Sequence, residues 1–203
     1  MKALLCTAFG PIDRLRIEDV AIPEPAAGQV RIRVKAASLN FPDALIVQGL
    51  YQAKPALPFS PGAELAGVID AVGDGVTAWR PGDAVIASTG HGGFAQQCVA
   101  DARQIAALPP GMAFDQGAAF VLTYGTSLHA LQQRARLQPG ETLLVLGAAG
   151  GVGGSRRSRS RRRSVRASSR RHRRPTSWRC AARPAPTRRS TTRPRTCAAA
   201  WTS

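Results

Sequence analysis

The sequence predicts a β-rich domain, then the first strand of an α/β domain, and then a tail that does not fold. Three observations support this fold class: short strand-like segments separated by glycine and proline, an apolar segment that runs into a glycine-rich turn, and an abrupt change of composition after Gly154. Many short, punctuated strands are typical of a small β-barrel or sandwich. A wholly apolar strand is typical of a buried parallel sheet.

The clearest strand is expected at 29–39, where Val30, Ile32 and Val34 alternate with charged residues. A period of two places these apolar side chains on one buried face and the charged ones on the other. The N-terminal residues MKALLCTAF also resemble a strand. Further short strands are expected at 65–72, 83–87 and 94–100, and turns rich in glycine, proline and aspartate separate them.

The pattern changes after Pro109-Pro110-Gly111. Segments 114–121 and 127–137 are predicted to be helices, and the second would carry Leu128, Leu131 and Ala135 near one face. Pro139-Gly140 then leads into the apolar strand expected at 142–146. This order indicates that a second, α/β domain begins behind the β-rich one.

The glycine-rich turn after this strand is the strongest local pattern. Without a Cβ, its backbone N–H groups can approach a dinucleotide pyrophosphate, which then lies at the N-terminus of the next helix. Tight packing is the alternative interpretation, but the position after a buried strand and a complete β-rich domain favours cofactor binding. The cofactor-binding residues expected here are Gly147, Gly150, Gly151, Val152 and Gly153.

The charge of the chain divides at Gly154. The net charge is +16, yet all 12 acidic residues lie in 1–154, together with 11 Lys and Arg. The remaining 49 residues contain 17 Arg, no acid, and no Gly, Leu, Ile or Phe. Such a composition cannot bury enough apolar surface to offset the loss of chain entropy. Residues 155–203 are therefore expected to be a disordered tail.

The four cysteines show no spacing typical of metal ligands, so we expect free thiols in a reducing compartment. The chain does not begin with a signal-peptide pattern, and no apolar run approaches the ~18 residues of a membrane span. The sequence predicts a soluble, cytoplasmic protein without a membrane partner.

Several blocks within 1–154 resemble one family. They are AASLNFPDALIVQGLY at 36–51, PFSPGAELAGVIDAVGDGVTAWRPGDAVIA at 58–87, GGFAQQCVAD, and GTSLHAL through LGAAGGVG. Their order and spacing are similar to those of the zinc-free quinone oxidoreductases of the medium-chain dehydrogenase/reductase superfamily. The resemblance implies a GroES-like catalytic domain at 1–121 and the start of a Rossmann nucleotide-binding domain at 122–154, with NADPH and substrate in the cleft between them.

The resemblance also implies a reaction, in which hydride passes from NADPH to a quinone or another conjugated carbonyl without zinc. A related enoyl or acryloyl-thioester reductase, which shares the fold and the hydride chemistry, is the alternative. The partner is then a small-molecule quinone or enone. Intact relatives are often homodimers, but a dimer built from Rossmann strands is not expected of this chain.

Two positions separate this sequence from the zinc-dependent branch of the superfamily. Asn40 stands where that branch has a Cys ligand, and Ala63 in Pro61-Gly62-Ala63-Glu64 stands where it has a His ligand. Amide and methyl side chains cannot replace thiolate and imidazole on Zn²⁺. No metal is therefore expected.

By the same resemblance, the expected catalytic residues are Asn40, Asp43 and Tyr51. Asn40 and Asp43 would line the nicotinamide and substrate cleft, Tyr51 would shape its wall, and Thr126 would contact the nicotinamide end of the cofactor. The Asn40 amide could hold the carboxamide of the cofactor or donate to an acceptor carbonyl, which gains negative charge as hydride arrives. The residues alone also favour a helix cap at Asn40-Phe41-Pro42-Asp43.

Three other titratable residues are candidates. Glu64 lies in an apolar stretch and is interpreted as a buried acid paired with a neighbour, in a structural or a catalytic role. His91, between two glycines, is expected at the surface, with an acid or base role as the alternative. His129 is interpreted as structural because no second ligand lies nearby.

The tail does not continue a Rossmann unit, which needs a helix after the glycine turn and then a second strand. Reading GC-rich codons for the tail in another frame yields LAAVEIAAALGARVVAAA and then DKLEV, which resemble the next helix and strand of the family. We therefore interpret residues 155–203 as a frameshift product that truncates the Rossmann domain. The truncated chain is expected to bind NADPH weakly or not at all and to be inactive.

If residues 155–203 are truly encoded, a different class of function is open to the chain. Seventeen Arg without acids would bind nucleic acid non-specifically, through counterion release, with an affinity that falls as salt rises. No specific nucleic acid is expected as a partner, because nothing in the sequence resembles a groove-reading fold.

Overall fold

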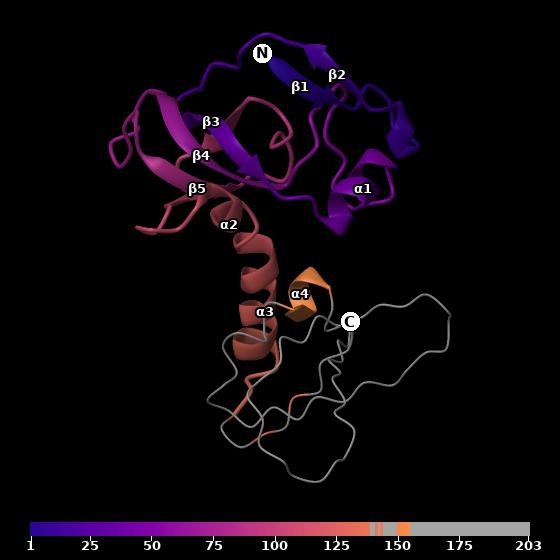
Figure 1. Ribbon diagram of the computed structural model, residues 1–203, viewed down its shortest axis with the longest axis vertical. Helices are drawn as coiled ribbons and strands as arrows, with labels where there is room; N and C mark the ends of the chain where they lie inside the picture. Colours follow the sequence, from indigo (N-terminus) through magenta and orange to yellow (C-terminus); the bar gives the residue numbers. More distant parts are fainter. Residues whose placement is uncertain (139–140, 142, 144–149, 155–203) are drawn as a thin grey trace, which may run out of the picture. The chain divides into compact units, whose positions relative to one another are not determined.

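The alternating segment forms β3 (Gln29–Ala37), an interior strand of a five-stranded antiparallel sheet (Figure 1). Val30 and Ile32 are fully buried, whereas Arg33 on the opposite face is exposed. This confirms the period-two interpretation of the segment.

The computed structural model describes residues 1–138, 141, 143 and 150–154. Gly147, the tail at 155–203 and all of the strand expected at 142–146 except Leu143 lie outside these residues.

The sheet has the strand order β6-β3-β4-β5-β7, with every neighbouring pair antiparallel. The other strands of the sheet are β4 (Glu64–Val72), β5 (Ala84–Ser88), β6 (Gln97–Asp101) and β7 (Ile105–Ala107). A two-stranded antiparallel sheet is formed by β1 (Lys2–Leu5) and β2 (Arg16–Asp19), with the short helix η1 (Ile12–Arg14) between them. The strands expected at 65–72 and 83–87 are confirmed to within one residue. The expectation of a β-rich domain is confirmed as well.

The strand expected at 94–100 begins later than predicted. The N–H of Phe94 donates to the Pro61 carbonyl, and Ala95 forms an isolated bridge with Ala3. These residues therefore pair with other segments, and pairing with β3 begins only at Gln97.

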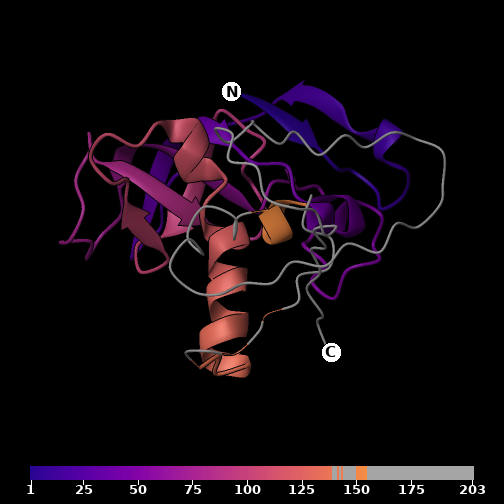
Figure 2. The same cartoon turned by 60° about the horizontal axis from the view of Figure 1, so that its bottom comes forward.

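Three small clusters make up the core of the first unit, which comprises Met1–Leu122. The largest lies on the inner face of the sheet and comprises Val30, Ile32, Leu65, Ile69, Val85, Ala87, Cys98, Ala100 and Ile105. On the other face of β4 and β5, α2 (Phe114–Ala118) packs through Phe114 and Ala118. The third lies between α1 (Phe41–Val47) and the N-terminal segment. In Figures 1 and 2, α1 lies beside the N-terminal strands and away from β5.

The helical segments differ from their expected bounds. The helix expected at 114–121 ends at Ala118, and a π-helical turn, η2 (Val121–Gly125), follows it. The helix expected at 127–137 is α3 (Thr126–Leu128) followed by the π-helical η3 (His129–Arg134). It ends early because Arg136 adopts a left-handed conformation with φ 47°.

The second unit, Thr123–Ser203, is described only in part. Its buried helical positions are Ser127 and Ala130, whereas Leu128 is 55% exposed. The short helix α4 (Gly151–Gly154) follows the glycine-rich turn. Within the part of the chain that the structure describes, no helix is long and apolar enough to cross a lipid bilayer.

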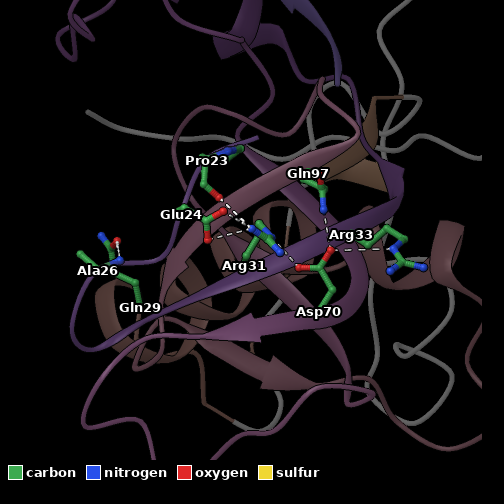
Figure 3. A network of polar contacts seen from close by, with 8 residues as sticks. All are labelled: Pro23, Glu24, Ala26, Gln29, Arg31, Arg33, Asp70 and Gln97. Atoms are coloured by element: carbon green, nitrogen blue, oxygen red, sulfur yellow. Dashed lines mark hydrogen bonds and ion pairs between the residues drawn. The ribbon is translucent and has the colours of Figure 1, made fainter. Parts of the chain in front are cut away.

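A polar network lies on the outer face of the sheet and centres on Asp70 (Figure 3). Arg31 pairs with Ala71 and Ile32 with Ile69, so Asp70 is the extra residue of a β-bulge in β4. Its carboxylate accepts hydrogen bonds from Arg31 Nε at 2.7 Å and from Gln97 Nε2 at 2.5 Å.

The network joins strands that are distant in sequence. Arg31 also contacts the Glu24 carboxylate at 3.0 Å, and Arg33 Nε lies 3.8 Å from Asp70 Oδ2. Burial tends to raise the pKa of Asp70, but the hydrogen bonds from Arg31 and Gln97 and the charges of Arg31 and Arg33 outweigh it and lower the pKa. The Asp70 carboxylate, at the bulge in β4, thus links β4 to the neighbouring strand β3 and to β6 beyond it.

Asp70→Asn is expected to lower the free energy of unfolding near neutral pH by about 1–3 kcal/mol, since hydrogen bonds to charged groups are lost. The folded pKa of Asp70 lies below its unfolded value. Its contribution is therefore present above the unfolded value and disappears as the pH falls through the folded value. Urea unfolding at a series of pH values should show parent and variant converging below about pH 4.

Asp19→Asn is the control, because its ion pair with Lys2 is exposed on both sides and should contribute less than about 1 kcal/mol. A constant difference between the Asp70 variant and the parent over the whole pH range would contradict the assignment.

Candidate active site

Asn40 and Asp43 meet at the start of α1. Asn40 is the N-cap residue, and Pro42 lies in the first turn. The backbone N–H of Asn40 donates to Asp43 Oδ2 at 2.7 Å. The helix-cap interpretation of these residues is therefore confirmed, because an acidic residue three positions after the cap satisfies a free backbone donor of the helix start.

Asp43 is a buried carboxylate held by backbone groups. The residue is 2% exposed, and its Oδ1 accepts the N–H of Ala63 at 3.0 Å. Burial raises the pKa of Asp43 above its ordinary value; hydrogen bonds from the N–H groups of Asn40, Ala63 and Gly62 oppose this shift, and the charge of Glu64 adds to it. Asp43 thus joins the start of α1 to the segment that enters β4.

Glu64 is the second buried acid, at the first position of β4. It is 1% exposed. Its Oε1 accepts from Ser38 Oγ at 2.5 Å and from Asn40 Nδ2 at 3.2 Å, and its Oε2 accepts the N–H of Leu122 at 2.8 Å. The interpretation as a buried acid paired with neighbours is confirmed, and the neighbours are neutral donors in the described part of the chain.

The Asn40 side chain completes this cluster, which comprises Ser38, Asn40, Asp43 and Glu64. Its Nδ2 donates to Ser38 Oγ at 2.7 Å as well as to Glu64. The Asn40 residue is partly exposed, whereas both acids are buried. The cluster can therefore present an amide to a ligand while its charges stay below the surface.

Tyr51 does not join this cluster. It is half-buried and packs against the apolar group formed by Cys6, Ile46, Val47 and Phe59. In the described structure, Tyr51 makes no polar contact with Asn40 or Asp43. Its expected role at the wall of the cleft stays a prediction.

The expected cofactor residues lie in the second unit. Thr126 begins α3 and is exposed. Gly150 precedes α4, which contains Gly151, Val152 and Gly153, so a helix starts where the glycine-rich turn predicts one. The Val152 carbonyl accepts from Ser127 Oγ at 3.1 Å. Gly147 lies outside the described residues.

A Cβ at position 151 would make only an ordinary van der Waals contact with Thr123. A Cβ built on Gly151 would lie 3.4 Å from Thr123 Cγ2. The structure therefore leaves room for a small side chain at this position. Ser127, which ties α3 to α4, carried no sequence signal because a single serine in a helix has no spacing of its own.

The two histidines of the described chain lie outside the cluster. His91 is exposed, as expected, and its ring packs edge-on against Phe59 at 6.0 Å between centroids. His129 Nδ1 lies 2.7 Å from Gln133 Oε1 on an exposed helical surface. Among the residues that the structure describes, no three His, Cys, Asp or Glu side chains are placed to share a metal ion.

The chain is similar to known proteins in both sequence and fold. Residues 26–110 match the alcohol dehydrogenase GroES-like domain. The chain is 42% identical over 155 residues to the quinone oxidoreductase of Rattus norvegicus, covering 75% of this chain and 47% of that protein. It therefore spans about half the length of the curated relatives it matches.

Two solved structures resemble this chain in fold as well. A quinone oxidoreductase of Pseudomonas syringae matches with a TM-score of 0.71 and 37% identity, over 75% of this chain and 47% of that one. A mycobacterial protein solved in complex with NADPH matches with a TM-score of 0.70 and 33% identity, over the same shares of the two chains.

Proposed function

We propose, from its similarity to quinone oxidoreductases, that the chain belongs to this family of the medium-chain dehydrogenase/reductase superfamily and carries the catalytic half of a zinc-independent, NADPH-linked reductase. The reaction is hydride transfer to a quinone or another conjugated carbonyl. The observation that carries the proposal is the cluster of Ser38, Asn40, Asp43 and Glu64, which presents one neutral amide above two buried acids.

Zinc independence follows from the donors that occupy the metal positions of the related zinc enzymes. Asn40 Nδ2 carries two hydrogens and has no lone pair to give to a metal, and it faces Ser38 and Glu64. The side chain of Ala63 is a methyl group, its backbone N–H is bound to Asp43, and its carbonyl accepts the N–H groups of Thr89 and Gly90. The residues present therefore do not fit a zinc ion.

The described residues fit a nicotinamide dinucleotide in two places. Gly151 is exposed at the start of α4, and a residue without a Cβ suits a backbone that approaches a phosphate group closely. The Asn40 amide suits the carboxamide of the nicotinamide ring. NADPH, when bound, supplies the hydride; Asn40 and Thr126 would orient the nicotinamide, and Gly150, Gly151, Val152 and Gly153 would hold the diphosphate.

We propose further that residues 155–203 result from a frameshift. The second Rossmann strand carries the ribose contacts in this class of fold, and these 49 residues contain no Gly, Leu, Ile or Phe from which to build it. The chain would then bind NADPH weakly or not at all, and a dimer built from Rossmann strands would not form.

The 203-residue chain is expected to show no NADPH-dependent reduction of 1,4-benzoquinone, whereas the frame-restored protein should turn over at ~1–10³ per second. NADPH oxidation followed at 340 nm measures both. Sequencing the coding DNA across Gly150 to Arg163 identifies the base to restore.

Asn40→Ala in the frame-restored protein tests the site. Its kcat/KM for quinone reduction should fall below that of the unsubstituted frame-restored protein. Turnover by the 203-residue chain at an ordinary enzymatic rate would refute the truncation, and an inactive frame-restored protein would refute the reductase.

A further inference from the structure

We infer that the open edge of β2 (Arg16–Asp19) is a docking surface for a second copy of this chain, whose own β2 pairs with it in antiparallel orientation. The two-fold axis of this pair runs through Ile17, and Arg16 of each copy lies beside Glu18 of the other. None of these residues belongs to the candidate active site, so the inference stands apart from the proposed function.

One edge of β2 has no neighbouring strand. The strand pairs with β1 alone, in a sheet of two strands. All four residues of β2 are exposed, and in Figure 1 the strand lies at the periphery of the first unit, beside β1. Within the part of the chain that the structure describes, no segment covers the outer edge of β2.

The hydrogen bonds to β1 show which backbone groups point to this edge. Met1 and Val20 exchange both backbone hydrogen bonds, at 2.7 and 2.8 Å. Bonded positions alternate in an antiparallel pair, so Ile17 and Asp19 turn their N–H and C=O groups to the open edge. The N–H of Leu4, opposite Ile17, donates to a carbonyl on the far side of β1, as this alternation requires.

Charge selects one register for the pairing of two copies. A hydrogen-bonded pair across the edge needs two residues whose backbone groups both point to it, which leaves few registers. The register centred on Ile17 places Arg16 beside Glu18 on both sides of the axis. The neighbouring registers centre on Arg16 or on Glu18, and each places two like charges directly opposite one another, which destabilises a sheet.

The Ile17 residues form the centre of the interface. Their backbone N–H and C=O groups bond to each other across the axis, so the open donors and acceptors of both strands are paired. The Ile17 side chain is 71% exposed in the single chain. Two β-branched side chains opposite one another pack well on a pleated sheet, so pairing removes this apolar surface from water.

Arg16 and Glu18 supply the charge complementarity. Side chains lie closest at the positions of an antiparallel pair that are not hydrogen-bonded, which these two residues occupy. Arg16 turns Nη1 to the carbonyls of Asp13 and Leu15, at 2.6 and 2.9 Å, and this leaves Nε and Nη2 for a carboxylate. The Glu18 side chain makes no hydrogen bond or ion pair with any residue that the structure describes, so it can accept from Arg16 of the second copy.

The dimer is weak, because the paired strands have only four residues each. An interface of this size belongs to the smallest class of specific contacts, with an expected Kd of about 10 µM to 1 mM. The charges on β2 also limit its pairing with the edges of other proteins.

Reversal of charge tests the register directly. Sedimentation velocity of the 203-residue chain, in reducing buffer at physiological ionic strength, measures the Kd. Arg16→Glu and Glu18→Arg should each weaken the dimer about tenfold, because like charges then meet on both sides of the axis. The two variants change the net charge in opposite directions, so an effect of net charge alone would move their Kd values apart. The double variant should restore the Kd of the parent.

Asp74→Arg is the matched control, because Asp74 is exposed and its side chain makes no contact within the described residues. It changes the net charge as Glu18→Arg does and should leave the Kd unchanged. If a charge variant does not fold by circular dichroism, Ile17→Lys decides, because it places two cations on the axis and should abolish the dimer.

A chain that stays monomeric at millimolar concentration would overturn the inference. A dimer that neither charge reversal nor Ile17→Lys weakens would place the interface elsewhere and overturn it as well. Loss of the dimer in both single variants without recovery in the double variant would contradict the register centred on Ile17.

Discussion

Gly67→Ala is expected to lower the free energy of unfolding of the first unit by about 3–5 kcal/mol, because an added methyl group would overlap the backbone of the neighbouring strand. Gly67 is buried in β4, opposite Val34 of β3. A Cβ at this position would overlap the Arg33 carbonyl oxygen and would lie 2.7 Å from Ile32 Cγ2. A backbone oxygen cannot move aside without breaking the pairing of β3 with β4.

Gly125→Ala is the matched control, because a Cβ at Gly125 meets nothing within 4 Å and the residue has helical dihedral angles. It should be neutral or stabilising by about 0.5–1 kcal/mol. Urea unfolding followed by circular dichroism compares the two variants. Equal stability of both variants would show that the β3–β4 contact is looser than described.

Asp43→Ala is expected to cost about 3–5 kcal/mol, because it leaves buried N–H groups without an acceptor. The groups concerned belong to Asn40, Ala63 and Gly62. The folded pKa of Asp43 is raised, so proton uptake adds stability below its unfolded pKa, and this part is lost as the pH rises through the folded pKa. The difference between parent and variant should therefore grow toward acid pH, opposite to the trend for Asp70.

The same chemical-denaturation measurement on Asp13→Ala controls for the loss of one carboxylate, because Asp13 is exposed and its side chain makes no described hydrogen bond. That variant should stay within about 0.5 kcal/mol of the parent. An Asp43→Ala protein as stable as Asp13→Ala would rule out a structural role for the buried carboxylate.

The sequence predicted the parts of the fold that local pattern controls. The alternation around Ile32 identified β3 because one face of the strand is buried at Val30 and Ile32 while Arg33 on the other face is exposed. The start of β6 was wrong because Phe94 and Ala95 bond to Pro61 and Ala3, partners distant in sequence. The π-helical turns were missed because hydrophobic spacing does not distinguish them from an α-helix.

Local sequence pattern likewise predicted one part of the candidate site and not the other. The spacing of Asn40 and Asp43 predicts a helix cap, and the structure contains it. The surroundings of Glu64 could not be predicted, because its donors Ser38 and Leu122 come from the residue after β3 and from η2. Only the folded chain shows that the Asn40 amide nitrogen faces Ser38 and Glu64.

The strand order has a consequence for how the domain folds. β3 pairs on one side with β4, which follows soon in the chain, but its other partner is β6, with Gln29 opposite Asp101. The N–H of Gln96 likewise bonds to the carbonyl of Lys2 at the beginning of the chain. Such non-local pairing slows folding, typically to milliseconds or seconds. During synthesis, one edge of β3 stays open until the chain has grown past Asp101, and in that interval it is exposed to association with other chains.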